Sequence, residues 1–100
     1  MYKITKDFPS EEKFGLINQI RRASVSIESN LAEGAGRNSS KDFSRFLDIA
    51  QGSAFEVKCQ ILIARDLNYI DNSKSELLMN KINEVSNTIA SLNQKLKTKN

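Results

Sequence analysis

Residues 43–64 have the sequence FSRFLDIAQGSAFEVKCQILIA, and this stretch decides the fold class. Its apolar side chains recur every three or four residues, so at 100° per residue they share about a third of a helix circumference. They are Phe43, Phe46, Leu47, Ala50, Ala54, Val57, Ile61 and Ala64. Ser39 and Asp42 form a weak capping box just before this stretch. The pattern predicts a long amphipathic helix that begins after Ser39.

The preceding segment has the same period and predicts another helix over residues 10–34. Its apolar face consists of Leu16, Ile20, Ala23, Ile27 and Leu31. Ser10, which follows Pro9, is placed to cap the N-terminus of this helix. Gly34 and Gly36 can end it and open a turn.

A third helix is predicted after Ser73, because Ser73 and Glu76 form a capping box. Beyond them the apolar residues alternate steps of four and three, which is the heptad pattern of a helix packed lengthwise in a bundle. These residues are Leu78, Ile82, Val85, Ile89, Leu92 and Leu96. Residues 69–72 are predicted to connect this helix to the one before it.

Together the three segments define an all-α protein. The 100 residues include only four Gly and one Pro, which favours helices over a turn-rich β-fold. Short connections make consecutive long helices antiparallel neighbours, so we expect an up-down helical bundle. A chain of this length has a single core, and we expect one domain over residues 1–100.

The residue types that are missing limit the chemistry. The sequence has no histidine, which excludes a Ser-His-Asp triad and any His-ligated metal site. Its one cysteine, Cys59, permits neither an intrachain disulfide nor a thiolate metal cluster. Acidic pairs such as Asp42 with Asp48 lie at helix starts or on polar faces, where capping and solvation explain them. We therefore expect a protein that is not an enzyme and uses no metal, cofactor or small-molecule substrate.

The sequence contains no candidate for a membrane-spanning helix. Its longest uninterrupted apolar run, Ile61 to Ala64, is far short of the ~20 residues that a span needs. Asp7, Glu11 and Glu12 interrupt the first twenty residues, which a signal peptide would not tolerate. The sequence predicts a soluble, cytoplasmic protein without a membrane partner.

The helix over residues 10–34 has a second apolar stripe in addition to its core face. With Leu16 at zero degrees, Phe14, Ile17 and Val25 lie between about 100° and 180° around the helix. Single apolar residues on a surface are normal, but three on one face favour burial against another helix or another subunit. We expect the chain to self-associate.

A polar stripe follows the edge of the core face on the same helix. It consists of Gln19, Arg22, Ser26, Asn30 and Glu33. These groups can contact a nucleic acid, or they can pair with the next helix, which is the more common fate of half-buried polar groups. Antiparallel packing would bring Arg22 near Ser53 and Glu56, so the second interpretation predicts an Arg22–Glu56 ion pair.

Motifs within residues 2–70 resemble a known family. They are Phe8-Pro9-Ser10-Glu11-Glu12, Phe14-Gly15-Leu16, Gln19, Arg21-Arg22-Ala23, Ser26-Ile27, Asn30-Leu31-Ala32-Glu33-Gly34, Gly36-Arg37, Phe46-Leu47, Ile49-Ala50, Gly52-Ser53 and Glu56. This combination resembles the four-helix-bundle proteins encoded in intervening sequences of bacterial 23S ribosomal RNA genes. That family is similar in turn to the accessory variability determinant of diversity-generating retroelements.

The resemblance implies a small, non-enzymatic four-helix bundle that assembles as a homopentamer, with nucleic acid as its suspected partner. Family members usually begin with another helix, which leads into a segment like Tyr2–Lys6. We therefore expect the first helix of the bundle to be truncated to a stub in this chain.

The basic residues provide a candidate interface. The net charge is +3 and the isoelectric point is near 9.1, which is compatible with a nucleic-acid partner. We expect contacts to the phosphates of RNA or DNA, without base specificity, from Arg21, Arg37, Lys41 and Arg45. Acidic residues interleave with them, so an ordinary solvated face explains the pattern equally well. The alternative function is a protein-interaction scaffold, such as a reverse-transcriptase accessory protein, which the surplus apolar stripe favours.

Overall fold

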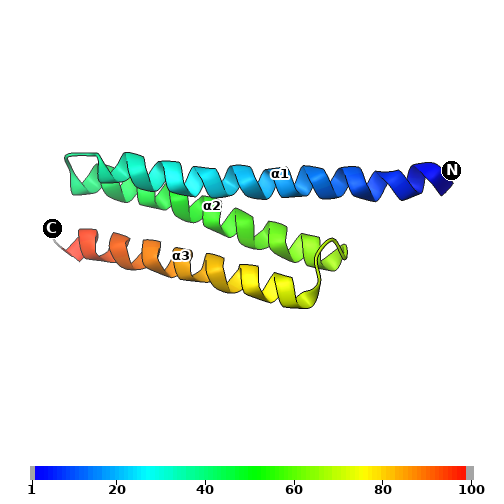
Figure 1. Ribbon diagram of the computed structural model, residues 1–100. Helices are drawn as coiled ribbons and strands as arrows, with labels where there is room; N and C mark the ends of the chain where they lie inside the picture. Colours follow the sequence, from blue (N-terminus) through cyan, green and yellow to red (C-terminus); the bar gives the residue numbers. More distant parts are fainter. Residues whose placement is uncertain (1, 99–100) are drawn as a thin grey trace.

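The computed structural model describes the backbone of residues 2–98 and the side chains of residues 11–97. The described chain forms three helices and no strands: α1 (Tyr2–Ala35), α2 (Ser40–Asp66) and α3 (Asn72–Thr98) (Figure 1). The prediction of an all-α protein is confirmed. None of the described helices is long and apolar enough to cross a membrane.

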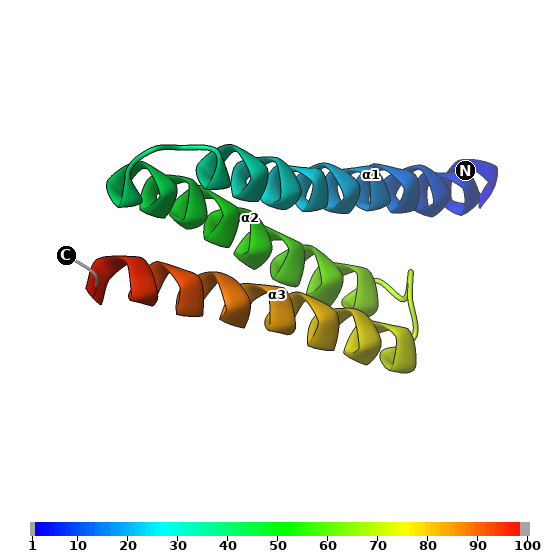
Figure 2. The ribbon, with the colours of Figure 1, turned by 60° about the vertical axis from the view of Figure 1, so that its left-hand side comes forward.

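The three helices lie side by side in one layer, and α2 lies between α1 and α3 in both views (Figures 1 and 2). α2 packs against both neighbours, whereas α1 and α3 do not contact each other within the described residues. The radius of gyration is 16.8 Å, compared with about 13 Å for a compact domain of 100 residues. The helices therefore form an open up-down layer, and the expected four-helix bundle is not formed.

The N-terminal part of α1 differs from the prediction. The helix begins at Tyr2 and runs through Pro9, so Ser10 lies inside it and does not cap it. A proline removes one backbone hydrogen bond from a helix interior, and here that loss does not end the helix. The expectation of a stub is wrong, because residues 2–6 form the first turns of a helix of 34 residues.

Residues from the predicted apolar ridges of all three helices form the core. Its buried members are Ala23, Ile27, Leu47, Ala50, Ala54, Val57, Ile61, Ile82 and Ile89. Most of them belong to α2, because that helix has a neighbour on each side. Leu47, Ala50 and Ala54 are completely buried.

The heptad prediction for α3 is wrong at two positions. Val85 and Leu92 are 36% and 37% exposed, whereas Ser86 and Asn93, one residue further along, are buried. The reason is that α3 packs against α2 alone, so its buried stripe is narrower than a bundle seam and is rotated toward these polar residues.

The helix starts can be read from their caps. Asp42 N donates to Ser39 Oγ at 3.1 Å, which confirms the predicted cap of α2. In α3, Lys74 N donates to Asp71 Oδ1 at 2.7 Å. The predicted Ser73 cap is therefore wrong, because a carboxylate two residues earlier takes that position and Ser73 lies within the helix.

The connection between α2 and α3 is anchored to α1. Asn68 adopts a left-handed conformation with φ of 62°, which asparagine tolerates better than most residues. The Tyr69 hydroxyl then donates to Glu12 Oε2 at 3.0 Å. Partial burial of the phenol raises its pKa, and the hydrogen bond to Glu12 adds to this shift.

α1 ends between Gly34 and Gly36, which confirms the predicted end of this helix, but Gly34 has a further role that was not predicted. α1 continues past it to Ala35, and Gly34 is buried against α2. A Cβ atom at this position would lie 2.8 Å from Phe43 Cδ1 and 2.9 Å from Phe46 Cβ. Gly34 therefore allows α1 and α2 to approach closely just before the turn. Gly36 belongs to the turn itself and its N–H donates to the carbonyls of Ala32 and Glu33.

Candidate nucleic-acid interface

Three of the four predicted phosphate contacts gather at the α1–α2 turn. Arg37 lies in the connection between the two helices, and Lys41 and Arg45 lie in the first turns of α2. Lys41 and Arg45 are four residues apart, which places them on one face of the helix. All three are exposed.

Two of these residues share an aromatic support. The guanidinium carbon Cζ of Arg37 lies 4.9 Å from the centre of the Phe46 ring, and that of Arg45 lies 5.1 Å from the same centre. Both distances are within the ~6 Å at which a cation is attracted to an aromatic face. The half-buried Phe46 ring thus positions two guanidinium groups at one surface.

The charges of the basic residues are only partly neutralised. Arg37 Nη2 lies 3.2 Å from Glu33 Oε2, and the two side chains are 45% and 62% exposed. An exposed pair of this kind contributes little to stability. Within the described residues, Lys41 and Arg45 form no ion pair.

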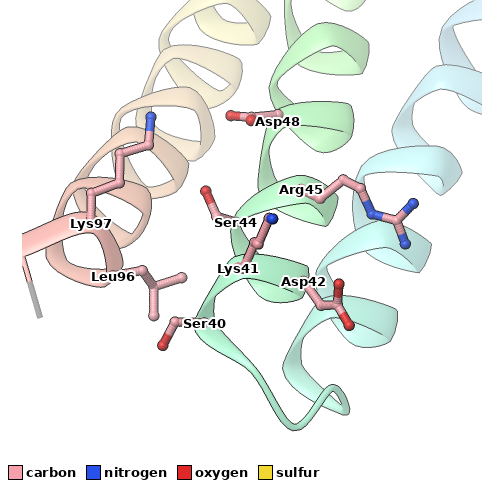
Figure 3. Close-up of a pocket in the computed structure, with 8 residues that line it drawn as sticks. All are labelled: Ser40, Lys41, Asp42, Ser44, Arg45, Asp48, Leu96 and Lys97. Atoms are coloured by element: carbon pink, nitrogen blue, oxygen red, sulfur yellow. The ribbon is translucent and has the colours of Figure 1, made fainter. Parts of the chain in front are cut away.

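A groove of about 500 Å³ lies beside this basic surface, between the start of α2 and the end of α3. Figure 3 shows its lining residues: Ser40, Lys41, Asp42, Ser44, Arg45, Asp48, Leu96 and Lys97. Ser44 and Asp48 point toward α3, whereas Arg45 extends toward α1 (Figure 3). Asn93 of α3 bonds to Ser44 and donates to Asp48 Oδ1 at 2.7 Å, and so contacts two of the residues that line the groove.

Arg21, the fourth predicted contact, lies apart from the others. It is exposed on α1, sixteen residues before Arg37, which corresponds to about 24 Å along a helix at 1.5 Å per residue. It could contact only a ligand that extends along α1.

The predicted polar stripe of α1 divides into separate contacts. Ser53 Oγ donates to Ser26 Oγ at 3.0 Å, and Asn30 Nδ2 donates to Ser26 O at 2.7 Å. Ser26 is therefore the member of the stripe that pairs with α2, whereas Asn30 bonds to Ser26 within α1. Glu33 instead binds Arg37 in the turn.

The Arg22–Glu56 ion pair is not formed among the described residues. Glu56 accepts a long hydrogen bond of 3.5 Å from Gln60 Nε2, while Gln19 and Arg22 are exposed. The contact between α1 and α2 is therefore narrower than predicted. Small residues such as Ala23 lie at its centre, and the neighbouring Arg22 lies outside it.

Sequence reasoning missed two features of this region. The first is the contact of Phe46 with two arginines. The helical pattern assigned Phe46 to the core alone, and the adjacent Arg45 is the only signal in the sequence for this second role. The other is the set of polar pairs between α2 and α3, which includes two hydrogen bonds between Gln51 and Ser86. The signal for these pairs is a polar residue directly after each exposed heptad position of α3: Ser86 follows Val85, and Asn93 follows Leu92.

These observations define a class of small, all-α protein: an open antiparallel layer of helices with a basic surface at one end. Within the described residues, no group of three or more His, Cys, Asp or Glu side chains is placed to hold a metal ion. The family model described as 23S rRNA-intervening sequence protein matches residues 1–91, and the chain belongs to this family. No curated protein matches the sequence.

Proposed function

We propose that this protein binds RNA without catalysing a reaction, and that it does so in the cytoplasm through the basic surface at the α1–α2 turn. The observation that carries the proposal is the placement of Arg37 and Arg45 on one aromatic ring, with Lys41 close by on the same end of α2. Exposed arginines in this arrangement suit phosphate groups, which accept two parallel hydrogen bonds from a guanidinium.

The binding should depend on the RNA backbone and not on its bases. No described aromatic side chain is offered as an exposed stacking platform at the turn, because Phe46 is half-buried and already covered by the two arginines. Phosphate contacts orient a protein on a nucleic acid but carry no sequence information. Arg21 would add a contact only on an RNA long enough to follow α1.

We further propose that the protein works as a homo-oligomer. Its accessible surface is 7235 Å², whereas a folded monomer of this mass exposes about 5,700 Å². The excess of roughly 1,500 Å² on one chain is about twice the ~800 Å² that each partner buries in a standard protein interface. Large apolar side chains contribute to it, among them Phe14 at 70% and Val25 at 60% exposure.

Assembly would also strengthen RNA binding. The family resemblance implies a pentamer, and any closed ring would repeat the basic surface once per subunit. Linked sites of modest affinity bind one ligand far more tightly than each site alone. This supports RNA binding by a chain whose net charge is only +3.

A gel-shift titration against a structured RNA at two salt concentrations tests the proposed RNA binding. We expect binding at low salt that weakens steeply as salt rises, because each neutralised phosphate releases a counterion. Absence of binding at low salt would overturn the proposal.

The exposed apolar surface also supports a second candidate, a scaffold that docks on another protein such as a polymerase or reverse transcriptase. A partner recovered by pull-down from cells after nuclease treatment would favour it. Loss of all partners on nuclease treatment would favour RNA binding instead.

A further inference from the structure

We propose that Arg37 and Arg45 form a two-pronged clamp for the RNA backbone, that Phe46 positions both prongs, and that Glu33 occupies one prong in the free protein. The inference depends on the proposed RNA binding. It identifies the basic residues that bind phosphate, the side chain that holds them in place and the carboxylate that competes with phosphate for Arg37.

The first argument is the spacing of the prongs. Both guanidinium carbons lie close to the centre of the same ring, so they cannot be farther apart than about 10 Å, the sum of the two distances. Phosphates follow one another at ~3.4 Å along the axis of a nucleic-acid strand. The clamp can therefore contact phosphates that lie within about three nucleotides of one strand.

The second argument is preorganisation. A guanidinium that stacks on an aromatic ring keeps the N–H groups at its edge free to bind phosphate. An arginine held in this way loses less conformational freedom on binding than a solvated side chain. Within the described residues Lys41 and Arg21 have no ring contact, so we expect them to contribute charge without the geometry.

The third argument is that Phe46 itself is held in place. Its Cβ atom lies only 2.9 Å from the point that a side chain on Gly34 would occupy, so α1 packs directly against it. Phe46 is thus a positioning residue: it touches both arginines but need not touch the RNA.

The fourth argument concerns Glu33. Its carboxylate oxygen lies 3.2 Å from Arg37 Nη2, which is a position that a phosphate oxygen could take. Because this pair is largely exposed, it costs little to separate. Removing the negative charge of Glu33 should therefore raise the affinity for RNA.

The test measures the affinity of a short RNA hairpin by fluorescence anisotropy at several salt concentrations. Each variant has a control that makes the same chemical change elsewhere. Arg37→Gln and Arg45→Gln are compared with Arg65→Gln, because Arg65 is also exposed, forms an ion pair with Asp66 and lies at the other end of α2. Glu33→Gln is compared with the exposed Glu28→Gln. Phe46→Leu is compared with Phe55→Leu, since Phe55 also lies under a cation, with Lys58 Nζ 4.7 Å from its ring centre.

We expect Arg37→Gln and Arg45→Gln each to weaken binding about tenfold, which corresponds to about 1.4 kcal/mol, because each removes a charged hydrogen-bond donor to phosphate. Each should also reduce the slope of log affinity against log salt concentration by about one, the amount expected for the loss of one phosphate contact. Glu33→Gln should tighten binding several-fold and Phe46→Leu should weaken it several-fold, while the three controls change it less than twofold.

Arg45→Lys keeps the inference testable if Phe46→Leu fails to fold, which circular dichroism would show. This variant preserves the charge, so a clamp predicts a several-fold loss of affinity and a diffuse basic patch predicts none.

The possible outcomes separate the two proposals. If the unaltered protein binds no RNA at low salt, the proposed function is wrong and the clamp with it. If it binds RNA but Arg37→Gln and Arg45→Gln behave like Arg65→Gln, RNA binding stands and the clamp is wrong. If a polyglutamate peptide displaces the labelled hairpin as effectively as unlabelled RNA does, the two arginines bind acidic protein segments and the proposed RNA clamp is wrong.

Discussion

The two sides of α2 are built differently. Its contact with α1 is mainly apolar and close, with the small residues Ala23 and Gly34 at the interface and one hydrogen bond between Ser26 and Ser53. Its contact with α3 adds polar pairs to an apolar line. Gln51 bonds to Ser86 twice, at 3.0 and 2.7 Å, and Asn93 bonds to both Ser44 and Asp48.

This difference distinguishes two requirements of a helix interface, which are stability and a fixed register. Burial of apolar surface stabilises a contact without fixing its register, because it is non-directional. Polar pairs must meet atom by atom, so sliding α3 by one turn would leave their donors and acceptors unpaired. We infer that the α1–α2 side provides close packing and that the α2–α3 side fixes the position of α3.

The largest expected loss of stability comes from creating a cavity on either side of α2. Ile27→Ala in α1 and Ile89→Ala in α3 each remove a buried side chain, and we expect each to lower the free energy of unfolding by about 2–5 kcal/mol. Urea denaturation at a fixed protein concentration measures both. A cost for Ile89→Ala below 1 kcal/mol would show that polar pairs alone hold α3.

The next effect tests the close approach of α1 and α2. Gly34→Ala places a Cβ against Phe43 and Phe46, and we expect it to destabilise the protein by about 1–3 kcal/mol. Gly52→Ala is the matched control, because nothing lies within 4 Å of its added Cβ. In a helix this control should stabilise by about 0.5–1 kcal/mol. Equal effects in thermal unfolding would contradict the role assigned to Gly34.

A smaller effect tests the polar side. Asn93→Ala removes the partner of Ser44 and Asp48, and we expect a loss of about 1–2 kcal/mol. On the apolar side, Ser26→Ala should cost less than 1 kcal/mol, because its hydroxyl makes a single contact with α2. The comparison fails if Ser26→Ala proves the more damaging change in urea denaturation.

The cap of α3 gives an effect of about 1 kcal/mol. Asp71→Ala removes the acceptor of the Lys74 N–H and should destabilise by that amount, whereas Ser73→Ala should be nearly neutral. The opposite order in thermal unfolding would restore Ser73 as the cap.

The smallest expected effect has the opposite sign. Gln60 is buried in α2, and its Oε1 has no hydrogen-bond partner within the described residues. Gln60→Leu removes this unpaired polar atom and should leave stability unchanged or raise it slightly. A loss above 1 kcal/mol would show that Gln60 has a partner, for instance in an oligomer.

The sequence was sufficient to predict most of the buried residues of α2, with Gln60 as the exception. Leu47, Ala50, Ala54 and Val57 follow the helical period, and the Ser39 cap depends only on its own turn. Such features are local, so a pattern along the chain predicts them.

The remaining features depend on how many neighbours each helix has. Val85 and Leu92 fit a heptad, yet they are exposed because α3 has a neighbour on one side only. Gly34 resembled a helix stop because its contact with Phe43 and Phe46 comes from a different helix. The same limit applies to the candidate site, where periodicity could not show that Arg37 and Arg45 share the Phe46 ring while Arg21 lies far away.

The most direct test of the central claim, that further copies of the chain complete the open layer, is sedimentation equilibrium over a series of protein concentrations. We predict a mass that is a multiple of the 11.3 kDa of one chain, and five times that value if the oligomer is a pentamer. A mass of 11.3 kDa at every concentration would contradict the claim.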